Sequence, residues 1–574
     1  MVPLLFWGAL AAAFVSAYAR KIDWEIGWVH DVNPDGMHKR RAMGINGQFP
    51  AQPISVNSNE FVGLKVTNKF YDGRGTTIHG HGLMQNNTNY YDGAPGLTQC
   101  SIMPNHSFWY EILNSAQKPK DAMDQWGTFW LHSHNASQYV DGLRAPFIIH
   151  NANGEVYDYD DEYTVVLTDW YHAEADDLGR RYLVPPPHAI VMPTPDSGLM
   201  YFAHTKANAT AKNLPGFNDD AKITFRPGKK YRLRILNASA TSMFNFWIEG
   251  HDMKIIEADG VDTEAHPVDV LQISTAQRYS VLVEARNDTK NNWKIHANMD
   301  PSMFESKKEH LKLNLTSTIT YGNDNAPFGK GRQTLESYEE MFDETVLKPI
   351  IKKPMVESDI SYNLVASLPK YTDGLSRGAF NNITYLPAKT PSMLTMMTEP
   401  NANKANAATY GPNSGALVLP HLQMVEITIV NDSGDKHPFH FHGTQFQIVH
   451  KAKKMNSASK LKNPPFKENQ ENPIRRDTVA IAGYGSATLR FRADNPGVWF
   501  MHCHMDWHLV KGFAMIVVQA PLVAAERFKV PDYVGQQCRM QGLPSSGNAG
   551  GIHDSTINFG NLTVGPEVAS SKTK

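Results

Sequence analysis

Short segments rich in apolar residues recur along the chain, and most of them predict β-strands. Examples are residues 60–66, 163–167, 231–236 and 425–430. In the last two, apolar and polar residues alternate, as in a strand with one buried face and one solvent-exposed face. Clusters of Asn, Asp, Gly and Pro separate these segments at short intervals. The pattern is typical of β-sandwiches rather than βαβ units, so we expect an all-β fold.

The strand-like segments also indicate an internal repeat. Residues 59–66, 228–234 and 423–430 resemble one another, and each lies about one sandwich domain from the next. The chain has 574 residues, a length that suits roughly three or four domains. We therefore expect three β-sandwiches, with a charged, proline-bounded linker before the last. The predicted bounds are 20–155, 156–325 and 355–574, with the linker at 326–354.

The first residues have the pattern of a secretory signal peptide. An apolar run ends in Ala17-Tyr18-Ala19, a small-x-small cleavage pattern, so residues 1–19 are predicted to be removed. The alternative is a buried N-terminal helix. No later stretch has the roughly 18 uninterrupted apolar residues that a membrane span needs. We therefore expect a secreted protein without a membrane span.

Charge and glycosylation motifs are consistent with secretion. The formal net charge is -2, so no strong charged field favours nucleic acid or anionic lipid, and we expect no nucleic-acid partner. Ten Asn-x-Ser/Thr motifs are acceptor sequences for N-glycosylation. Their asparagines are Asn86, Asn105, Asn135, Asn208, Asn237, Asn287, Asn314, Asn382, Asn431 and Asn561.

The three cysteines predict one disulfide and one metal ligand. They are Cys100, Cys503 and Cys538. In an oxidising compartment an odd number leaves one cysteine unpaired. Cys503 lies between two histidines, and we assign it to a metal site. Cys100 and Cys538 then pair by default, which requires an early segment and the C-terminal region to meet in space.

Four short segments hold ten of the 24 histidines. They are IHGHG (78–82), WLHSH (130–134), HPFHFHG (437–443) and HCHMDWH (502–508). In a strand, the two imidazoles of a His-x-His pair lie on one face, because side-chain direction repeats every two residues. A single pair is more often an ordinary surface or core pair, but four pairs in one chain favour a metal site.

The His-Cys-His sequence places two kinds of ligand on opposite faces of one strand. Cys503 points away from His502 and His504, so the strand can serve two metal sites. Several imidazoles without carboxylates suit copper or zinc, and a thiolate with two imidazoles suits blue copper. A structural zinc site would favour paired cysteines, which this segment lacks.

With these motifs, the sequence resembles the multicopper oxidases over almost its whole length. The similarity includes NGQFP (46–50), QNNTNYYDGAPGLTQC (85–100), GTFWLHSH (127–134), DGLRAPFIIH (141–150), HPFHFHG and HCHMDWHLVKGF. NPDG (33–36), DWYH (169–172) and FWIEGHDMKIIEADGV (246–261) are most similar to the fungal ferroxidase-type branch. The resemblance implies three Greek-key cupredoxin domains and four copper ions, with O2 as the electron acceptor.

The resemblance also implies a role for each histidine in the four segments. His437, Cys503 and His508 match the ligands of the type 1 copper, and His79 and His440 match those of the type 2 copper. The ligands of the type 3 pair are matched by His81, His132, His134, His442, His502 and His504.

Three further positions near these motifs are carried over from the family. Asp92 and Asp506 match acidic residues that the family places beside the trinuclear cluster, and we expect them to donate protons or orient ligands. From the local sequence alone, Asp92 could equally be a turn-forming residue. Phe513 occupies the axial position of the type 1 site, where a phenyl ring cannot act as a ligand; the loss of an axial thioether should raise the copper potential.

The sequence specifies the electron donor less closely than it specifies the metal ligands. Asp432 and Asp300 approximately match two carboxylates that bind iron(II) in ferroxidases, but Met192 replaces the third. A thioether is a poor ligand for iron(II), so we expect a laccase-like oxidase of phenols or naphthols. The alternative is a soluble ferroxidase, and a third class is a copper-binding or electron-transfer protein without oxidase activity.

Overall fold

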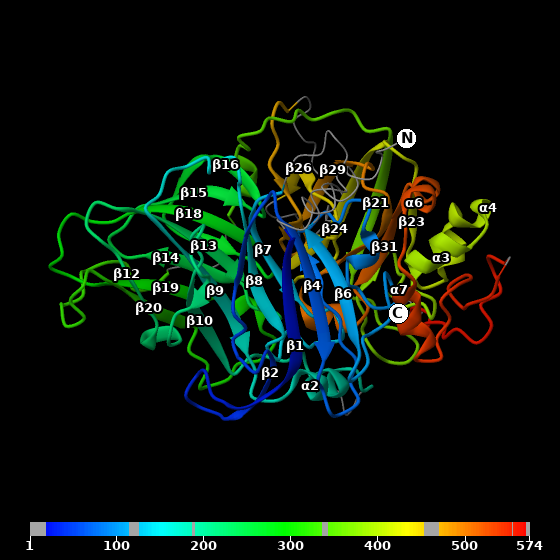
Figure 1. Ribbon diagram of the computed structural model, residues 1–574, viewed down its shortest axis with the longest axis horizontal. Coiled ribbons are helices and arrows are strands. Elements are labelled where there is room, and N and C mark those ends of the chain that lie inside the picture. The colour runs from blue at the N-terminus through cyan, green and yellow to red at the C-terminus, as the bar shows by residue number, and fades with distance from the viewer. Residues whose placement is uncertain are drawn as a thin grey trace, which may run out of the picture.

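A computed structural model describes residues 19–113, 125–185, 190–335, 342–452, 470–553 and 555–569. In this part of the chain the strands form six sheets. The sheets pair into three sandwich domains that follow one another along the sequence (Figure 1), so the expected all-β fold is confirmed. All of the predicted signal peptide except Ala19 lies outside the described residues.

The first domain contains two four-stranded sheets. The outer sheet has the order β2 (Arg40–Ile45), β1 (Ala19–Val32), β4 (Phe61–Asn68), β6 (Ser107–Leu113). The second has the order β3 (Ile54–Asn57), β8 (Arg144–His150), β7 (Gly127–His132), β5 (His79–His81). The histidine pair of β5 therefore lies on an edge strand of its sheet.

The second domain contains a seven-stranded and a five-stranded sheet. The larger has the order β11 (Lys212–Asn213), β10 (Ser197–His204), β9 (Asp161–Trp170), β13 (Lys230–Asn237), β18 (Arg278–Glu284), β15 (Met253–Ala258), β16 (Val261–Val268). The smaller has the order β12 (Lys222–Thr224), β20 (Asn314–Thr320), β19 (Trp293–Met299), β14 (Phe244–Ile248), β17 (Leu271–Ile273).

The third domain contains a six-stranded and a five-stranded sheet. The first has the order β22 (Ala379–Phe380), β21 (Ile360–Ser367), β24 (Met424–Asn431), β29 (Ser486–Arg492), β26 (Phe446–Ala452), β27 (Arg475–Arg476). The second has the order β23 (Leu417–Leu419), β31 (Ala514–Gln519), β30 (Gly497–Cys503), β25 (His437–Phe441), β28 (Thr478–Ile481).

The predicted strands and the internal repeat are both present in the structure. The four example segments fall in β4, β9, β13 and β24. The three similar segments occupy equivalent places, because each runs parallel to an early strand of its own domain: β4 beside β1, β13 beside β9, and β24 beside β21. The repeat in sequence therefore reflects a repeated sandwich topology.

One prediction about these strands is wrong. The alternation in β13 predicts that Arg232 and Arg234 face solvent, but they are only 2% and 0% exposed. They pair with Glu155, Glu162 and Glu257 at N–O distances of 2.7–2.9 Å. Because Glu257 also contacts Thr128 of the first domain, a strand that reads as half-exposed is covered on both faces.

Short helices lie between and after the strands. They are α2 (Ala175–Tyr182), α3 (Ser392–Thr398), α4 (Asn401–Lys404), α5 (Asp506–Val510), α6 (Pro521–Arg527) and α7 (Asp532–Arg539), with 3-10 turns η1 (Asn89–Tyr91), η3 (Asn218–Asp220), η4 (Pro301–Met303), η5 (Glu344–Val346) and η6 (Ala407–Tyr410). Within the described residues, no helix has the length and apolar character needed to cross a membrane.

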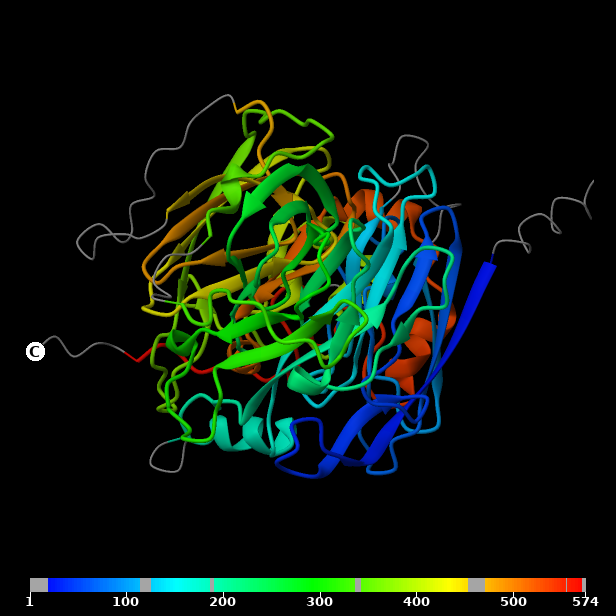
Figure 2. The same cartoon turned by 90° about the vertical axis from the view of Figure 1, so that its left-hand side faces the viewer.

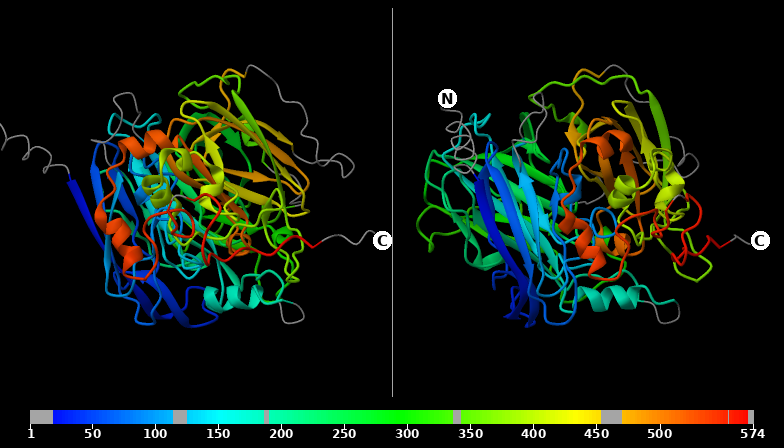
Figure 3. Two further views of the ribbon diagram at one scale, coloured as in Figure 1. Left: turned by 90° about the vertical axis from the view of Figure 1, so that its right-hand side faces the viewer. Right: turned by 45° about the vertical axis from the view of Figure 1, so that its right-hand side comes forward.

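The C-terminal helices return to the first domain. Figures 1 and 3 show α7, in orange-red, against the blue strands of that domain. Tyr533 of α7 packs on Phe108 of β6, with ring centroids 5.2 Å apart. The predicted disulfide between Cys100 and Cys538 is confirmed, with Cα atoms 5.1 Å apart. Such a bond suggests folding in the secretory pathway.

All three domains contact one another (Figure 2). Thr128 of the first domain donates its backbone N–H to Glu257 of the second at 2.6 Å. Arg278 of the second domain pairs with Asp477 of the third at 2.6 Å. Histidines of the first and third domains stack directly, as described below. The sequence predicted three domains but not that each domain would contact the other two.

Candidate metal centres

The four histidine segments are brought together by two pairs of antiparallel strands. In the first domain β5 pairs with β7, which places His79 opposite His132. In the third domain β25 pairs with β30, which places His440 opposite His502. The two strand pairs face each other across the boundary between these domains.

Ring stacking and short contacts join the histidines of the two domains. Ring centroids are 3.7 Å apart for His81 and His440, and 3.8 Å apart for His79 and His442. The Nε2 atoms of His442 and His502 are 3.2 Å apart. Eight histidines form this cluster: His79, His81, His132, His134, His440, His442, His502 and His504.

Burial favours the neutral form of several of these imidazoles. Desolvation first, and then the neighbouring imidazoles, hold the pKa of His134, His442 and His504 well below the usual value. A neutral imidazole is the form that binds a metal ion.

Several nitrogen atoms of the cluster have no hydrogen-bond partner among the described residues. They are His79 Nε2, His81 Nδ1, His132 Nε2, His440 Nε2 and both nitrogens of His504. A buried polar atom without a partner is unusual in a folded protein and calls for an explanation. A metal ion with imidazole ligands supplies one, and several neutral imidazoles without an added thiolate suit copper or zinc.

The opposite nitrogen of several of these rings is held by the backbone. The Nδ1–H of His79 donates to the carbonyl of Asp92 at 2.7 Å, and that of His440 donates to the carbonyl of Asp477 at 2.9 Å. The Nδ1–H of His502 donates to the carbonyl of Cys503 at 3.0 Å. Such contacts fix the tautomer and turn Nε2 toward the interior of the cluster.

A second, smaller group lies on the other face of β30. The Nδ1 atoms of His437 and His508 each lie 3.7 Å from Cys503 Sγ, and all three side chains are buried. Cys503 thus points away from His502 and His504, as the two-residue period predicts. Burial raises the pKa of the thiol, so a metal ion at this site would have to displace the thiol proton.

The chain returns to this group through a tight loop. β30 ends at Cys503, and α5 begins at Asp506 and carries His508 back beside the sulfur. The Cys503 N–H donates to the Phe513 carbonyl at 3.0 Å and closes the loop. The Phe513 ring is 0% exposed and lies edge-on to His437 at 5.2 Å between centroids, so an apolar side chain packs against the thiolate site.

The two predicted acidic residues have different surroundings. Asp92 is fully buried, and its Oδ2 accepts the Nδ1–H of His442 at 2.8 Å. Asp506 lies at the start of α5, and burial raises the pKa of its carboxyl to about 7. Its Oδ2 has no partner among the described residues. Asp92 therefore orients a cluster histidine directly, whereas Asp506 is a protonatable group near the cluster.

Sequence reasoning missed two residues that contact the histidines. Asp477 Oδ1 lies 3.3 Å from His81 Nε2, and Arg278 also holds this carboxylate. The signal was present in Arg475-Arg476-Asp477, a run of charges directly before a buried apolar strand. Ser433 Oγ lies 2.7 Å from His437 Nε2, and no pattern in the sequence indicated this contact.

Of the three predicted substrate residues, two are buried and the third is half-buried. Met192 is 4% exposed and belongs to the core cluster. Asp300 is 0% exposed, caps the turn at Ser302, and pairs with Lys436 at 2.6 Å. Asp432 is half-buried. The apolar substrate contact expected from Met192 is therefore largely covered by protein.

Two exposed carboxylates lie near these positions instead. Glu305 accepts a hydrogen bond from the Met192 N–H at 3.4 Å. Burial, and then the charges of Glu305 and Asp435, raise the pKa of Tyr182, so both carboxylates lie near one phenol. Lys511, three residues after His508, lies 3.6 Å from the centre of the Tyr182 ring.

Comparison with known proteins agrees with this architecture. Three multicopper oxidase family models match residues 28–154, 161–324 and 385–522. The iron multicopper oxidase fer1 of Mycosarcoma maydis is 46% identical over 99% of this chain and 91% of its own length. The iron transport multicopper oxidase fio1 of Schizosaccharomyces pombe is 36% identical over 96% of this chain and 84% of its own length.

Solved structures show the same fold. The crystal structure of Fet3p, described as a multicopper oxidase that functions in iron import, has a TM-score of 0.84, with 31% identity, 96% of this chain and 100% of that chain covered. A laccase from Botrytis aclada has a TM-score of 0.75, with 28% identity, 91% of this chain and 92% of that chain covered. The three sandwiches are therefore cupredoxin-like domains.

Proposed function

This chain belongs to the multicopper oxidase family, and on that premise we propose that it oxidises ferrous iron and delivers the electrons to O2. The proposal takes the alternative of the sequence reading in preference to phenol oxidation. The similarity to iron multicopper oxidases, up to 46% identity over nearly the whole chain, is the observation that carries it. Among the solved structures, the multicopper oxidase that functions in iron import is also more similar than the laccase, with 31% against 28% identity and a TM-score of 0.84 against 0.75.

The donor atoms described above support four copper ions. His437, Cys503 and His508 would hold one of them, as in a blue-copper site. The eight-histidine cluster would hold the other three, with His79 and His440 on the type 2 ion. When bound, copper supplies the redox chemistry: it accepts electrons singly from the donor and delivers four to one O2 molecule, which becomes water.

The chain's own residues would connect and support these sites. Cys503 is covalently adjacent to His502 and His504, so a short backbone path joins the two groups of ligands. Reduction of O2 to water consumes four protons. Asp506, whose pKa is raised to about 7 by burial, is suited to release and take up protons near neutral pH. Asp92 holds His442 through its Nδ1–H.

Glu305 and Asp435 are our candidates for contact with iron(II). Oxygen ligands suit hard cations, and both carboxylates are exposed. Asp435 is two residues before His437. Asp300, in contrast, is already paired with Lys436. A carboxylate from another loop would thus provide the negative charge that Met192 cannot.

Steady-state kinetics with iron(II) and simple phenols test this proposal. Neutralising Glu305 by Glu305→Gln should lower kcat/KM for iron(II) by about tenfold, a loss of ~1.4 kcal/mol of transition-state stabilisation. Turnover of an uncharged phenol should change less than about twofold, since it gains little from a negative charge. Glu309→Gln, which removes an exposed carboxylate from the same loop, is the matched control and should leave both values unchanged.

Two results would reject the iron assignment. One is a kcat/KM for a phenol or naphthol that far exceeds the value for iron(II) in the unmodified enzyme. The other is an equal loss in Glu305→Gln and Glu309→Gln, which would indicate a general effect of charge. The first result would restore the laccase-like function, with phenols as the reductant.

A further inference from the structure

A polar cavity lies at the junction of the first and second domains. Its volume is about 360 Å³, and none of the residues that line it belongs to the histidine clusters. Those used below are Arg20, Ser55, Asn57, Glu60, His150 and Asn208. A cavity of this size falls within the range of about 300–1,000 Å³ that holds small organic ligands.

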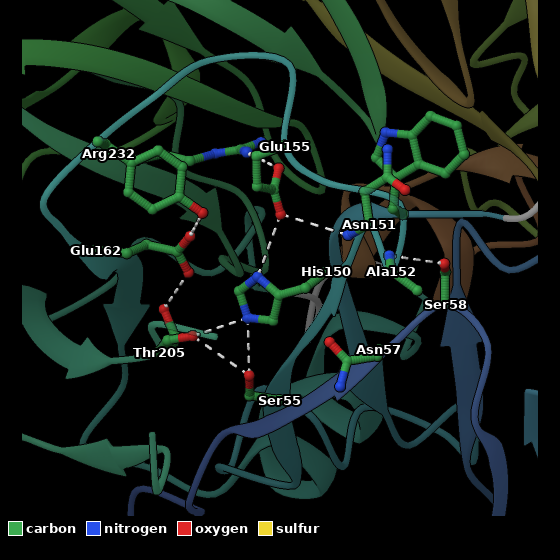
Figure 4. A network of polar contacts seen from close by, with 12 residues as sticks. Ser55, Asn57, Ser58, His150, Asn151, Ala152, Glu155, Glu162, Thr205 and Arg232 are labelled. Atoms are coloured by element: carbon green, nitrogen blue, oxygen red, sulfur yellow. Dashed lines mark hydrogen bonds and ion pairs between the residues drawn. The ribbon is translucent and has the colours of Figure 1, made fainter. Parts of the chain in front are cut away.

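The floor of the cavity is built from both domains. Figure 4 shows His150, at the end of β8, between Ser55 of β3 and Thr205 of the second domain. His150 Nε2 lies 2.9 Å from Ser55 Oγ and 3.0 Å from the Thr205 carbonyl. His150 Nδ1 lies 3.4 Å from Glu155, which pairs with Arg232. The floor is therefore held by a buried network and is not free to collapse.

The wall of the cavity offers hydrogen-bond donors and acceptors that a ligand could use. Glu60 Oε1 accepts the N–H and the side-chain amide of Asn57, and Arg20 donates to the Ser55 carbonyl. Among the described residues, Glu60 Oε2 and Asn57 Oδ1 accept no hydrogen bond, and Arg20 has further donors. Because Arg20 and Glu60 balance each other's charge, this wall suits a neutral ligand with hydroxyl and amide groups better than a simple ion.

Asn208 forms the rim and belongs to the sequence Asn208-Ala209-Thr210, one of the ten glycosylation motifs. It is exposed, its backbone is in the left-handed region with φ +62°, and its side-chain amide makes no hydrogen bond to another described residue. The amide nitrogen is thus accessible and lies at the edge of the cavity.

Two other motifs have the same Asn-x-Ser/Thr pattern but no accessible side-chain amide. Asn237 and Asn431 are both 0% exposed. The Asn237 Nδ2 donates to the Ser242 carbonyl at 2.8 Å, and the Asn431 Nδ2 donates to the Asp435 carbonyl at 2.7 Å. A glycan on either nitrogen would prevent these contacts, so the folded structure excludes modification there.

We propose that Asn208 carries an N-linked glycan and that its first sugar, N-acetylglucosamine, occupies this cavity. The donor would be a lipid-pyrophosphate-linked oligosaccharide of the secretory pathway. The bond from sugar C1 to the pyrophosphate oxygen breaks, the bond from C1 to Asn208 Nδ2 forms, and Nδ2 releases one proton. The linked sugar is then at the rim, with hydroxyl and acetamido groups that match Glu60, Asn57 and Arg20.

A sugar in this position contacts both domains, so it should stabilise their junction. It binds only the folded arrangement, because the wall comes from the first domain and the linkage from the second. We expect the loss of this sugar to lower the Tm at which the first two domains unfold by about 2–4 °C. The inference depends on passage through the secretory pathway and is independent of whether iron or a phenol is the substrate.

Two variants of the acceptor motif distinguish the effect of the sugar on Tm from the effect of the Asn208 side chain. Thr210→Ala removes the motif but keeps Asn208, whereas Thr210→Ser keeps the motif. In protein secreted by a eukaryotic host, glycopeptide mass spectrometry should find a glycan at Asn208 in the unmodified chain and in Thr210→Ser only. Tm should fall in Thr210→Ala alone, and Asn287→Gln, which removes an exposed motif elsewhere, should leave Tm unchanged.

Enzymatic trimming tests whether the first sugar is the stabilising one. An endoglycosidase that leaves a single N-acetylglucosamine at each site should preserve Tm. An amidase that removes whole glycans, and converts each linked Asn to Asp, should lower Tm in the unmodified chain more than in Thr210→Ala. Glu60→Gln should lower Tm more in the glycosylated protein than in Thr210→Ala. An unmodified Asn208, equal Tm values for the two trimmed proteins, or an equal effect of Glu60→Gln in both backgrounds would overturn the proposal.

Discussion

Two buried polar regions of this protein have opposite properties. The eight-histidine cluster lies between the first and third domains, and an ionic network of two arginines and three glutamates lies between the first and second. In the network, every charged side chain has an oppositely charged partner: Arg232 with Glu155 and Glu257, and Arg234 with Glu162 and Glu257. In the cluster, several imidazole nitrogens have no hydrogen-bond partner within the part of the chain that the structure describes.

This difference separates a structural polar core from a binding site. Burying polar or charged groups costs free energy, and partners within the protein offset that cost in the ionic network. No described residue offsets it for the unpartnered imidazole nitrogens, which a bound metal ion would satisfy. Removing a residue from the network should therefore mainly affect stability, and removing one from the metal sites should mainly affect activity.

Cys503→Ser should have the largest effect on activity. A hydroxyl does not replace the thiolate of a blue-copper site, so we expect kcat to fall by more than about a hundredfold, beyond the usual loss from a supporting residue. Oxygen uptake and visible absorption of the copper-loaded protein measure this loss. The Tm of the metal-free protein should change little, because serine is nearly the same size. Substantial oxygen uptake by the variant would contradict the assignment.

Arg234→Met should have the largest effect on stability. It leaves the buried carboxylates of Glu162 and Glu257 without a full set of partners, at a cost of about 3–5 kcal/mol. Denaturant unfolding measures this cost, while the visible absorption per copper should stay the same. The control is Arg181→Met, which removes an exposed arginine paired with Asp177 on α2 and should cost less than about 0.5 kcal/mol. Similar costs for both variants would refute the role of the network.

Asp92→Asn should have an intermediate effect on the cluster. The carboxylate accepts the Nδ1–H of His442, and the loss of such a contact typically lowers metal affinity or activity by about 10–100-fold. Copper content and oxygen uptake measure the change. The visible absorption from the Cys503 site should be unaffected, because Asp92 does not contact that group. A parallel loss of both signals would show that the two metal groups are not independently supported.

Lowering the pH should weaken the ionic network progressively. The charges of Arg232 and Arg234 outweigh burial and lower the pKa of Glu257 from 4.5 to about 2. The stabilisation is therefore present above pH 4.5 and is lost as the pH falls toward 2, by at most about 1.4 kcal/mol per pH unit. Denaturant unfolding at pH 5 and pH 3 measures this loss. Glu257→Gln should show a smaller difference between these pH values, and an equal difference would exclude Glu257 as the titrating group.

The sequence predicted features that depend on local periodicity and residue chemistry. The strands, the repeated topology and the opposite orientations of Cys503 and His502 all follow from a two-residue period within one segment. The Cys100–Cys538 disulfide followed from assigning Cys503 elsewhere. By contrast, sequence reasoning missed the contacts of Asp477 and Ser433 with histidines. The run of charges at 475–477 did not indicate which side chain Asp477 would contact, and no pattern indicated the contact of Ser433.

Exposure was the property least accessible from sequence. Arg232 and Arg234 appear solvent-facing from their alternation, yet they are buried because another domain covers the strand. Met192 suggested an open apolar substrate contact, yet it packs into the core, and the accessible acidic groups belong to Glu305 and Asp435. Ten motifs of the same Asn-x-Ser/Thr pattern could not be ranked until Asn208 was found beside a cavity and Asn237 in the core.

The sequence by itself determined the fold class and the types of side chain that could hold a metal ion, because strand period and donor-atom chemistry are local properties. Only the tertiary structure decided which imidazoles share one cluster, which charges are buried and paired, and which carboxylates and asparagines are accessible. Those properties depend on how three domains pack against one another, and packing between distant segments has no short-range signature in the chain.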